Sequence, residues 1–153
     1  MFRKVGKYYM QDTDIRLEIA RHFAFARQKR KEFLVSQSKE FGITTSSLGA
    51  LIHTIYDQEG AVQDDISAIL SMDKAFVTRE LNALHASGLI RREKDARDHR
   101  KNHIYLTEEG RKVAESIHTI ITAWLDKVYA GFSDAEIDKM LEFMQRIKEN
   151  AKK

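Results

Sequence analysis

The spacing of the apolar residues changes from helical to alternating at Gly88, and the change restricts the folds that the chain can adopt. Before Gly88, three apolar residues recur at i, i+4 and i+7 and so share one face of a helix: Val77, Leu81 and Leu84. After it, the segments LIRREK (89–94) and NHIYLT (102–107) read as short strands. The side chains of the second strand should alternate between two faces, with Ile104 and Leu106 on one and His103 and Tyr105 on the other. The sequence thus predicts a helix that leads directly into a two-stranded hairpin.

Further helices are predicted on both sides of this unit. Apolar periodicity and capping residues place them at 12–40, from Thr44 or Thr45 to 60, around 66–70, at 74–87, at 108–131 and from Ser133 onward. Gly49 costs about 1 kcal/mol against alanine inside its helix, which suggests close backbone packing there. Ser133 and Glu136 are spaced as a capping box. The chain has no proline, although average usage of about 5% would give roughly eight, and helix interiors exclude proline. We therefore expect a mainly α fold.

Composition excludes several classes of protein. The chain has 153 residues, 42% hydrophobic and 32% charged, which suits one folded domain. It contains no cysteine, so disulfides, cysteine-ligated metals and thiol redox sensing are excluded. We find no signal peptide and no apolar run of the roughly 18 residues that a membrane span needs, so a cytoplasmic protein without a membrane partner is expected. No phosphate loop, nucleophile elbow or carboxylate pair is found, so we expect neither an enzyme nor a cofactor.

Two short helices joined by a tight turn and followed by a hairpin form a helix-turn-helix with a wing. In this arrangement the second helix enters the DNA major groove. Arg79 is chemically suited to guanine and Asn82 to adenine, and Thr78 suits a base or a phosphate. Phe76 either contacts thymine methyl groups or packs back against the first helix. The face opposite the apolar stripe presents the candidate DNA-binding residues Lys74, Ala75, Phe76, Thr78, Arg79 and Asn82.

The loop of the hairpin is strongly basic. Residues 91–101 carry six basic and three acidic side chains, a net charge of +3 that equals the charge of the whole chain. Asp98 and Arg100 lie two apart, so they share a side of an extended segment, and the carboxylate can orient the guanidinium. An arginine at a hairpin tip suits the narrow minor groove of A-tract DNA. Four of the other basic side chains of the segment would then contact phosphates: Arg91, Arg92, Arg97 and Lys101.

Two other functions remain compatible with these features. A winged helix can serve as a protein-interaction module, although such a module needs no arginine at the wing tip. A non-specific architectural protein would bind DNA with strong salt dependence and little sequence preference. A solvated loop with surface ion pairs worth about 0 to 1 kcal/mol is the structural alternative for the wing.

The segment DISAILSMDKAFVTRELNALHASGLIRREKDARDHRKNHIYLTEEGRKV resembles the core of the MarR family of transcriptional regulators. The resemblance rests on three motifs, which are DK..VTR.L..L...GLI.R, D.RD.R and LTEEG. It implies a homodimer that binds a pseudo-palindromic operator in double-stranded DNA as a ligand-responsive repressor. It also implies that Arg100, oriented by Asp98, enters the minor groove. Ala75 and Phe76 depart from the small polar residues common at their positions, and Val62 replaces a threonine cap.

The same resemblance implies a division of the chain into three parts. Residues 1–42 and 108–153 would form the dimerisation helices, and residues 43–107 the DNA-binding lobe. A small-molecule effector would bind where these parts meet, near His22, Phe23, His53 or Trp124. The apolar stripes of the terminal helices supply the expected dimer interface, which comprises Ile15, Ile19, Phe23, Trp124, Leu141, Met144 and Ile147.

Histidine spacing offers little evidence for a metal site. His99 and His103 are four apart, but in an extended hairpin that spacing is about 13 Å. The other four histidines are scattered along the chain, and no metal ligand is predicted. Zinc is the effector of some members of the family that the chain resembles, and it remains a minor alternative here.

Overall fold

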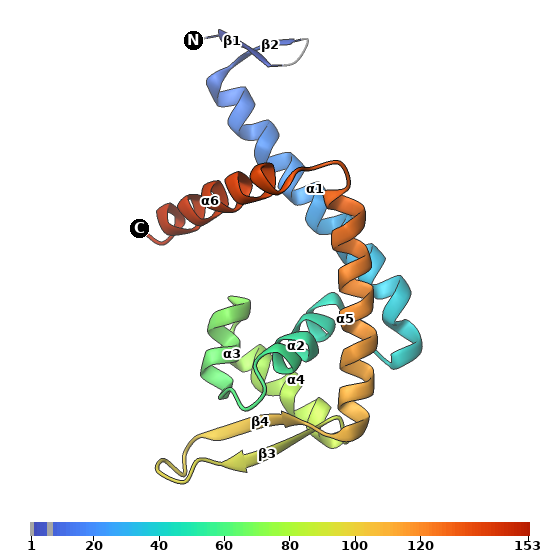
Figure 1. Cartoon of the computed structure of the whole chain (residues 1–153). Coiled ribbons are helices and arrows are strands. Elements are labelled where there is room, and N and C mark those ends of the chain that lie inside the picture. The colour runs from blue at the N-terminus through green and yellow to red at the C-terminus, as the bar shows by residue number, and fades with distance from the viewer. Residues whose placement is uncertain (1, 6–7) are drawn as a thin grey trace.

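The computed structural model describes residues 2–5 and 8–153 (Figure 1). The helices are α1 (Asp12–Ser38), α2 (Ser46–Asp57), α3 (Gln63–Leu70), α4 (Lys74–Ala86), α5 (Glu108–Tyr129) and α6 (Asp134–Ala151), with a short 3-10 helix at Lys39–Phe41. The strands form two antiparallel hairpins, β1 (Phe2–Val5) with β2 (Tyr8–Gln11) and β3 (Ile90–Lys94) with β4 (Asn102–Leu106). The mainly α fold with a hairpin wing is confirmed, whereas the hairpin before α1 was not predicted.

Helix boundaries follow the local capping chemistry. The Thr45 hydroxyl accepts a hydrogen bond from the Leu48 N–H at 3.1 Å, so α2 begins as predicted. At α6 the predicted capping box is present, and the Glu136 carboxylate accepts the Ser133 N–H at 2.9 Å. Val62 places no side-chain cap on α3 and instead forms a β-bridge with His103, which ties the start of α3 to the wing.

The core lies between the helix-turn-helix and α5. In the wing, Ile90 pairs with Leu106 and Arg92 with Ile104, so the apolar side of each strand faces the helices. The predicted alternation of β4 is confirmed, because Ile104 is 1% and Leu106 is 4% exposed. Isoleucines from three helices, α2, α3 and α5, meet these side chains in one buried cluster, which includes Ile52, Ile55, Ile66 and Ile117.

Two glycines show how closely the backbones approach. A Cβ at Gly110 would lie 1.8 Å from the carbonyl oxygen of Leu89, so only glycine lets the first turn of α5 pack on the chain that enters the wing. A Cβ at Gly49 would meet only the Ile43 side chain, at 3.6 Å. The close backbone packing suggested for Gly49 is therefore wrong, because an ordinary methyl contact fits there.

The long helices project beyond the lobe. Figure 1 shows α5 running beside the C-terminal half of α1, with α2–α4 and the wing at one end and α6 extending to the side. No residue of α6 is buried, and Leu141, Met144 and Ile147 are 56%, 40% and 48% exposed. Within the described part of the chain, no helix combines the length and apolar character needed to cross a membrane.

Candidate nucleic-acid interface

The second helix of the helix-turn-helix is held firmly at its N-terminus. The Asp73 carboxylate accepts the N–H groups of Ala75 and Phe76 at 2.9 and 3.0 Å. The turn before it passes through Ser71, whose φ of 51° is left-handed. Val77 and Leu81 are fully buried, as predicted, and this burial fixes which face of α4 is outermost. The predicted DNA-binding residues of α4 therefore lie away from this buried stripe, and Lys74, Ala75, Arg79 and Asn82 are exposed.

Three of the predicted residues on α4 are free to meet a partner. Lys74, Ala75 and Arg79 are exposed. Lys74 forms an ion pair with Asp64 of α3 at 3.0 Å, in which both side chains remain more than two-thirds exposed. Such a pair contributes little to stability, about 0 to 1 kcal/mol, and can open when a phosphate approaches.

Of the two positions that the sequence allows for Phe76, the structure shows the one against the protein. Its side chain is half-buried and packs on the hydrophobic core. The Arg79 guanidinium lies 5.3 Å from the centre of the Phe76 ring, a cation–π distance. The Phe76 ring therefore helps to orient the Arg79 side chain. It does not project from the surface as a DNA contact of its own.

Thr78 and Asn82 are engaged within the protein. The Thr78 hydroxyl accepts from the Gln63 amide at 2.6 Å and donates to the Lys74 carbonyl at 2.7 Å. The Asn82 side-chain oxygen accepts from the Arg92 guanidinium at 2.8 Å. These bonds lock α3 to α4 and α4 to the wing, so both side chains would have to exchange a partner to read a base.

Arg92 differs from its neighbours in the wing. It was predicted at the phosphate backbone, but its side chain is half-buried beneath the hairpin and holds Asn82. Its Nε is buried without a hydrogen-bond partner among the described residues. Arg91 turns the other way, forms an ion pair with Glu93 and lies 4.5 Å over the Tyr105 ring.

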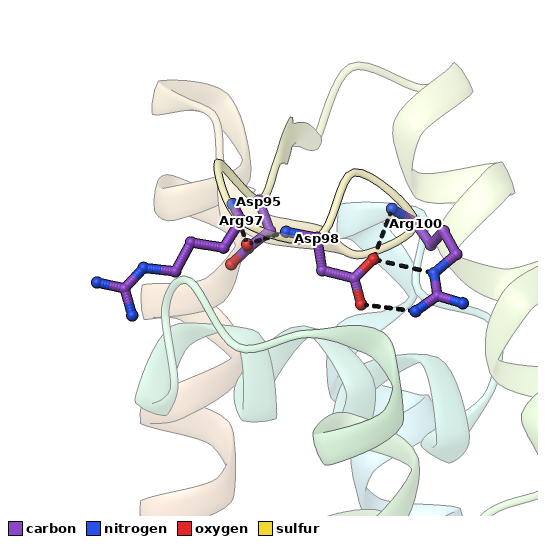
Figure 2. A network of polar contacts seen from close by, with 4 residues as sticks. All are labelled: Asp95, Arg97, Asp98 and Arg100. Carbon is purple, nitrogen blue, oxygen red and sulfur yellow. Dashed lines mark hydrogen bonds and ion pairs between the residues drawn. The ribbon is translucent and has the colours of Figure 1, made fainter.

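At the tip of the wing, Asp98 holds Arg100 as expected. The Arg100 Nε donates to the Asp98 carboxylate at 3.0 Å and its backbone N–H at 3.1 Å, while the Arg100 side chain remains 91% exposed (Figure 2). The hydrogen bonds from Arg100 hold the pKa of Asp98 below its usual range. The reason given from sequence was wrong, because the segment is not extended. The Lys101 N–H donates to the Asp98 carbonyl at 2.8 Å, which closes a turn that brings the two side chains together.

A second carboxylate shapes the rest of the loop. The Asp95 carboxylate accepts the backbone N–H groups of Arg97 and Asp98, each at 2.8 Å, and Figure 2 shows the Arg97 guanidinium extending away from this centre. The same carboxylate lies 2.8 Å from Nε2 of His103, whose Nδ1 is 2.6 Å from the Gly60 carbonyl. Hydrogen bonding to His103 and to the loop backbone lowers the pKa of Asp95 to about 2, and Asp95 in turn raises the pKa of His103.

The sequence patterns did not predict the contacts of Asp95 and His103. Alternation correctly placed His103 on the outer side of β4, but nothing local indicates that this side meets the turn after α2. The pair connects the wing to the helix-turn-helix, so it sets where the wing tip stands relative to α4.

Geometry and comparison together define the class of protein. The segment 41–101 matches the family model of the MarR family. The HTH-type transcriptional regulator BilQ of Clostridium symbiosum (strain WAL-14163) is 27% identical over 120 residues, which are 77% of this chain and 83% of that protein. The structure of the S. aureus MepR–DNA complex is 27% identical, with a TM-score of 0.76 over 84% of this chain and 93% of that one. These features are those of a winged-helix DNA-binding protein.

Over residues 41–101 the chain is similar to the MarR family, and its relatives include transcriptional regulators. A MarR family regulator from Listeria monocytogenes in complex with a 26mer DNA has the same fold. Its TM-score is 0.79 at 21% identity, over 92% of this chain and 89% of that one.

Proposed function

We propose that the chain binds a pseudo-palindromic duplex as a homodimer and represses transcription. The observation that carries the proposal is the wing tip, where Arg100 is 91% exposed yet held in one direction by Asp98. An exposed arginine whose side-chain conformations are already restricted loses less conformational entropy when it binds a groove or a phosphate. In this proposal Arg79 and Lys74 meet the major groove while Arg97 and Lys101 meet the backbone.

The homodimer is supported by apolar surface on the terminal helices. Ile19 and Phe23 of α1 are each 45% exposed, and three apolar residues of α6 are exposed to a similar degree. Ile15 and Trp124 were also predicted at the interface. Both are already buried within the single chain, where they are only 7% and 8% exposed. The proposed interface therefore centres on the exposed residues. In this proposal residues 1–42 and 108–153 join the protomers and residues 43–107 contact DNA.

The response to a ligand is proposed at the junction of α1 and α5. A groove there is lined by the apolar Phe25, Phe33, Trp124 and Val128 and by the charged or polar Lys29, Glu32, Ser36 and Lys127. The Phe33 and Trp124 ring centres are 5.4 Å apart. Of the other candidates, His22 lies on the exposed side of α1 and pairs loosely with Glu18 at 3.8 Å. An aromatic effector that also carries a polar or charged group suits this lining. It would act by binding more tightly at one spacing of the dimer's two DNA-binding lobes than at another.

The test is selection from random duplex DNA at about 0.15 M salt, where non-specific binding is weak. The native chain, Arg100→Ala and the control Arg21→Ala are run in parallel, because the control removes the same charge from α1. Enrichment of an inverted repeat with half-sites about one helical turn apart is expected for the native chain and the control. Arg100→Ala should lose its preference for A·T-rich flanks.

Failure of this test would have a definite meaning. Binding without sequence enrichment would favour a non-specific architectural protein. Absence of DNA binding would favour the protein-interaction module, and the wing would then be a solvated loop.

A further inference from the structure

Two histidines and a carboxylate from distant parts of the chain meet on the surface between α2 and α5. His53 and Asp57 are four apart on α2, and His118 comes from α5. One ligand atom from each of the three lies within 4.8 Å of the others. The DNA-binding surface described above uses none of these residues.

We propose that His53, His118 and Asp57 form a binding site for a divalent transition-metal ion, with Zn²⁺ as the best match. Nε2 of His53 and Nδ1 of His118 are 3.1 Å apart. Two nitrogen ligands at about 2.0–2.1 Å from a tetrahedral zinc are separated by about 3.3 Å, so only a small movement is needed. Imidazole nitrogen suits zinc, copper and nickel, whereas magnesium and calcium prefer oxygen ligands.

Asp57 gives this pair the carboxylate partner that metal-binding histidines usually have. Its Oδ2 lies 3.0 Å from Nδ1 of His53, on the opposite side of the ring from His118. When the Nδ1–H of His53 donates a hydrogen bond to Asp57, Nε2 of His53 is left free to bind the ion. The Asp57 side chain is 46% exposed, and one of its oxygens lies within 4.8 Å of a ring nitrogen of each histidine.

The surroundings allow an ion to enter and hold the two rings in place. His118 and Asp57 are exposed, while the His53 side chain is 20% exposed. The two imidazole rings are parallel within 5°, with centres 5.3 Å apart, and Tyr56 packs beside His118 at 5.7 Å. Water would complete the coordination. Because α2 belongs to the DNA-binding lobe and α5 leads out of it, a bound ion would join the two.

A chain of hydrogen bonds without an ion would produce the same geometry. The His118 Nδ1–H would donate to His53, and the His53 Nδ1–H to Asp57. The experiment must therefore measure metal binding itself. Zn²⁺ is titrated into the full chain, free of any histidine tag, by calorimetry and by competition with a chromogenic chelator.

The expected result is saturable binding of one Zn²⁺ per chain. His118→Ala should abolish it, and Asp57→Asn should weaken it roughly 10- to 100-fold. His85→Ala is the matched control, because it removes an exposed histidine from α4 and should bind zinc as the native chain does. Circular dichroism checks folding, and the exposed His118 keeps the test valid even where a His53 variant unfolds.

Two results would overturn the site. One is no saturable binding by the folded native chain, and the other is unchanged binding by His118→Ala. The assay contains no DNA, so its outcome is independent of the proposed transcriptional function.

Discussion

At the scale of single residues, the wing is organised by carboxylates that direct cations. Asp98 fixes the guanidinium of Arg100 while leaving it 91% exposed, and Asp95 fixes the loop backbone on which Arg97 is carried. Without these acids, the arginines would sit on a loose hairpin and would lose more conformational entropy on binding a partner than they do when held in place. Simple electrostatics and preorganisation make opposite predictions about removing such an acid.

Asp98→Ala is expected to weaken DNA binding even though it makes the wing more positive. Without the carboxylate, Arg100 samples more rotamers, so binding should fall by part of the about 1–3 kcal/mol expected for Arg100→Ala. Fluorescence anisotropy with the selected duplex, applied to both single variants and the double variant, measures the coupling. Tighter binding by Asp98→Ala would show that repulsion outweighs orientation.

His103 is expected to titrate above its ordinary pKa of about 6.5, and the cause is Asp95. The ion pair is fully present below the unfolded-state pKa and is lost as pH rises through the raised folded-state pKa. Asp95 stays charged throughout, since its own pKa is about 2. The wing anchor should therefore weaken from near-neutral to alkaline pH.

An NMR titration of the His103 ring measures this shift directly. Asp95→Asn should bring the pKa of His103 down, whereas the neighbouring variant Asp98→Asn should leave it in place. An unshifted His103 in the native chain would mean that the pair does not form in solution.

At the scale of elements, helix ends and glycines decide where α2, α5 and the wing join. Thr107 accepts the Gly110 N–H at 3.0 Å and donates to the Gly88 carbonyl at 2.7 Å, so one side chain caps α5 and also ties it to the end of α4. Gly110 then packs directly against the Leu89 backbone. The LTEEG motif is therefore a structural junction as well as a marker of the family.

The two helical glycines provide a matched pair of alanine substitutions. Gly110→Ala must push the Leu89 backbone away, so we expect a loss of several kcal/mol in the free energy of unfolding. Gly49→Ala meets only an ordinary contact and should stabilise the protein by about 0.5–1 kcal/mol through helix propensity. Urea denaturation measures both, and a destabilised Gly49→Ala would show that its site is tighter than the structure indicates.

At the scale of the whole molecule, α6 is the element that a single chain leaves without a partner. It has a well-formed capping box and a continuous apolar stripe, yet none of its residues is buried. Isolated helices are marginal in water, and most helical stability in proteins comes from packing of the apolar face. A second copy of the chain, as proposed above, would provide that packing.

Leu141→Lys should therefore dissociate the dimer, and Glu142→Lys should not. Both place a lysine on α6, but Leu141 lies in the apolar stripe while Glu142 pairs only with Lys139 on the polar face. Sedimentation velocity at several concentrations distinguishes monomer from dimer. Equal effects of the two variants would show that the dimer interface does not include the apolar stripe of α6.

Much of the fold was predictable because it depends on local rules. The stripe of Val77, Leu81 and Leu84, the cap at Thr45, the capping box at Ser133 and the wing strands are all set by residues within a few positions of one another. The Asp98–Arg100 pair belongs to the same group, since only two positions separate the partners, although the turn that joins them was not foreseen.

The sequence by itself determined the helix-turn-helix and the wing, because periodicity, capping and turn chemistry act over short distances. Only the tertiary structure decided that Asn82 holds Arg92, that His103 joins Asp95 to Gly60, and that His118 stands 3.1 Å from His53 across 65 positions. Those contacts arise where separately formed elements pack. Their geometry depends on how α2, α5 and the wing bury the shared core, which no local spacing encodes.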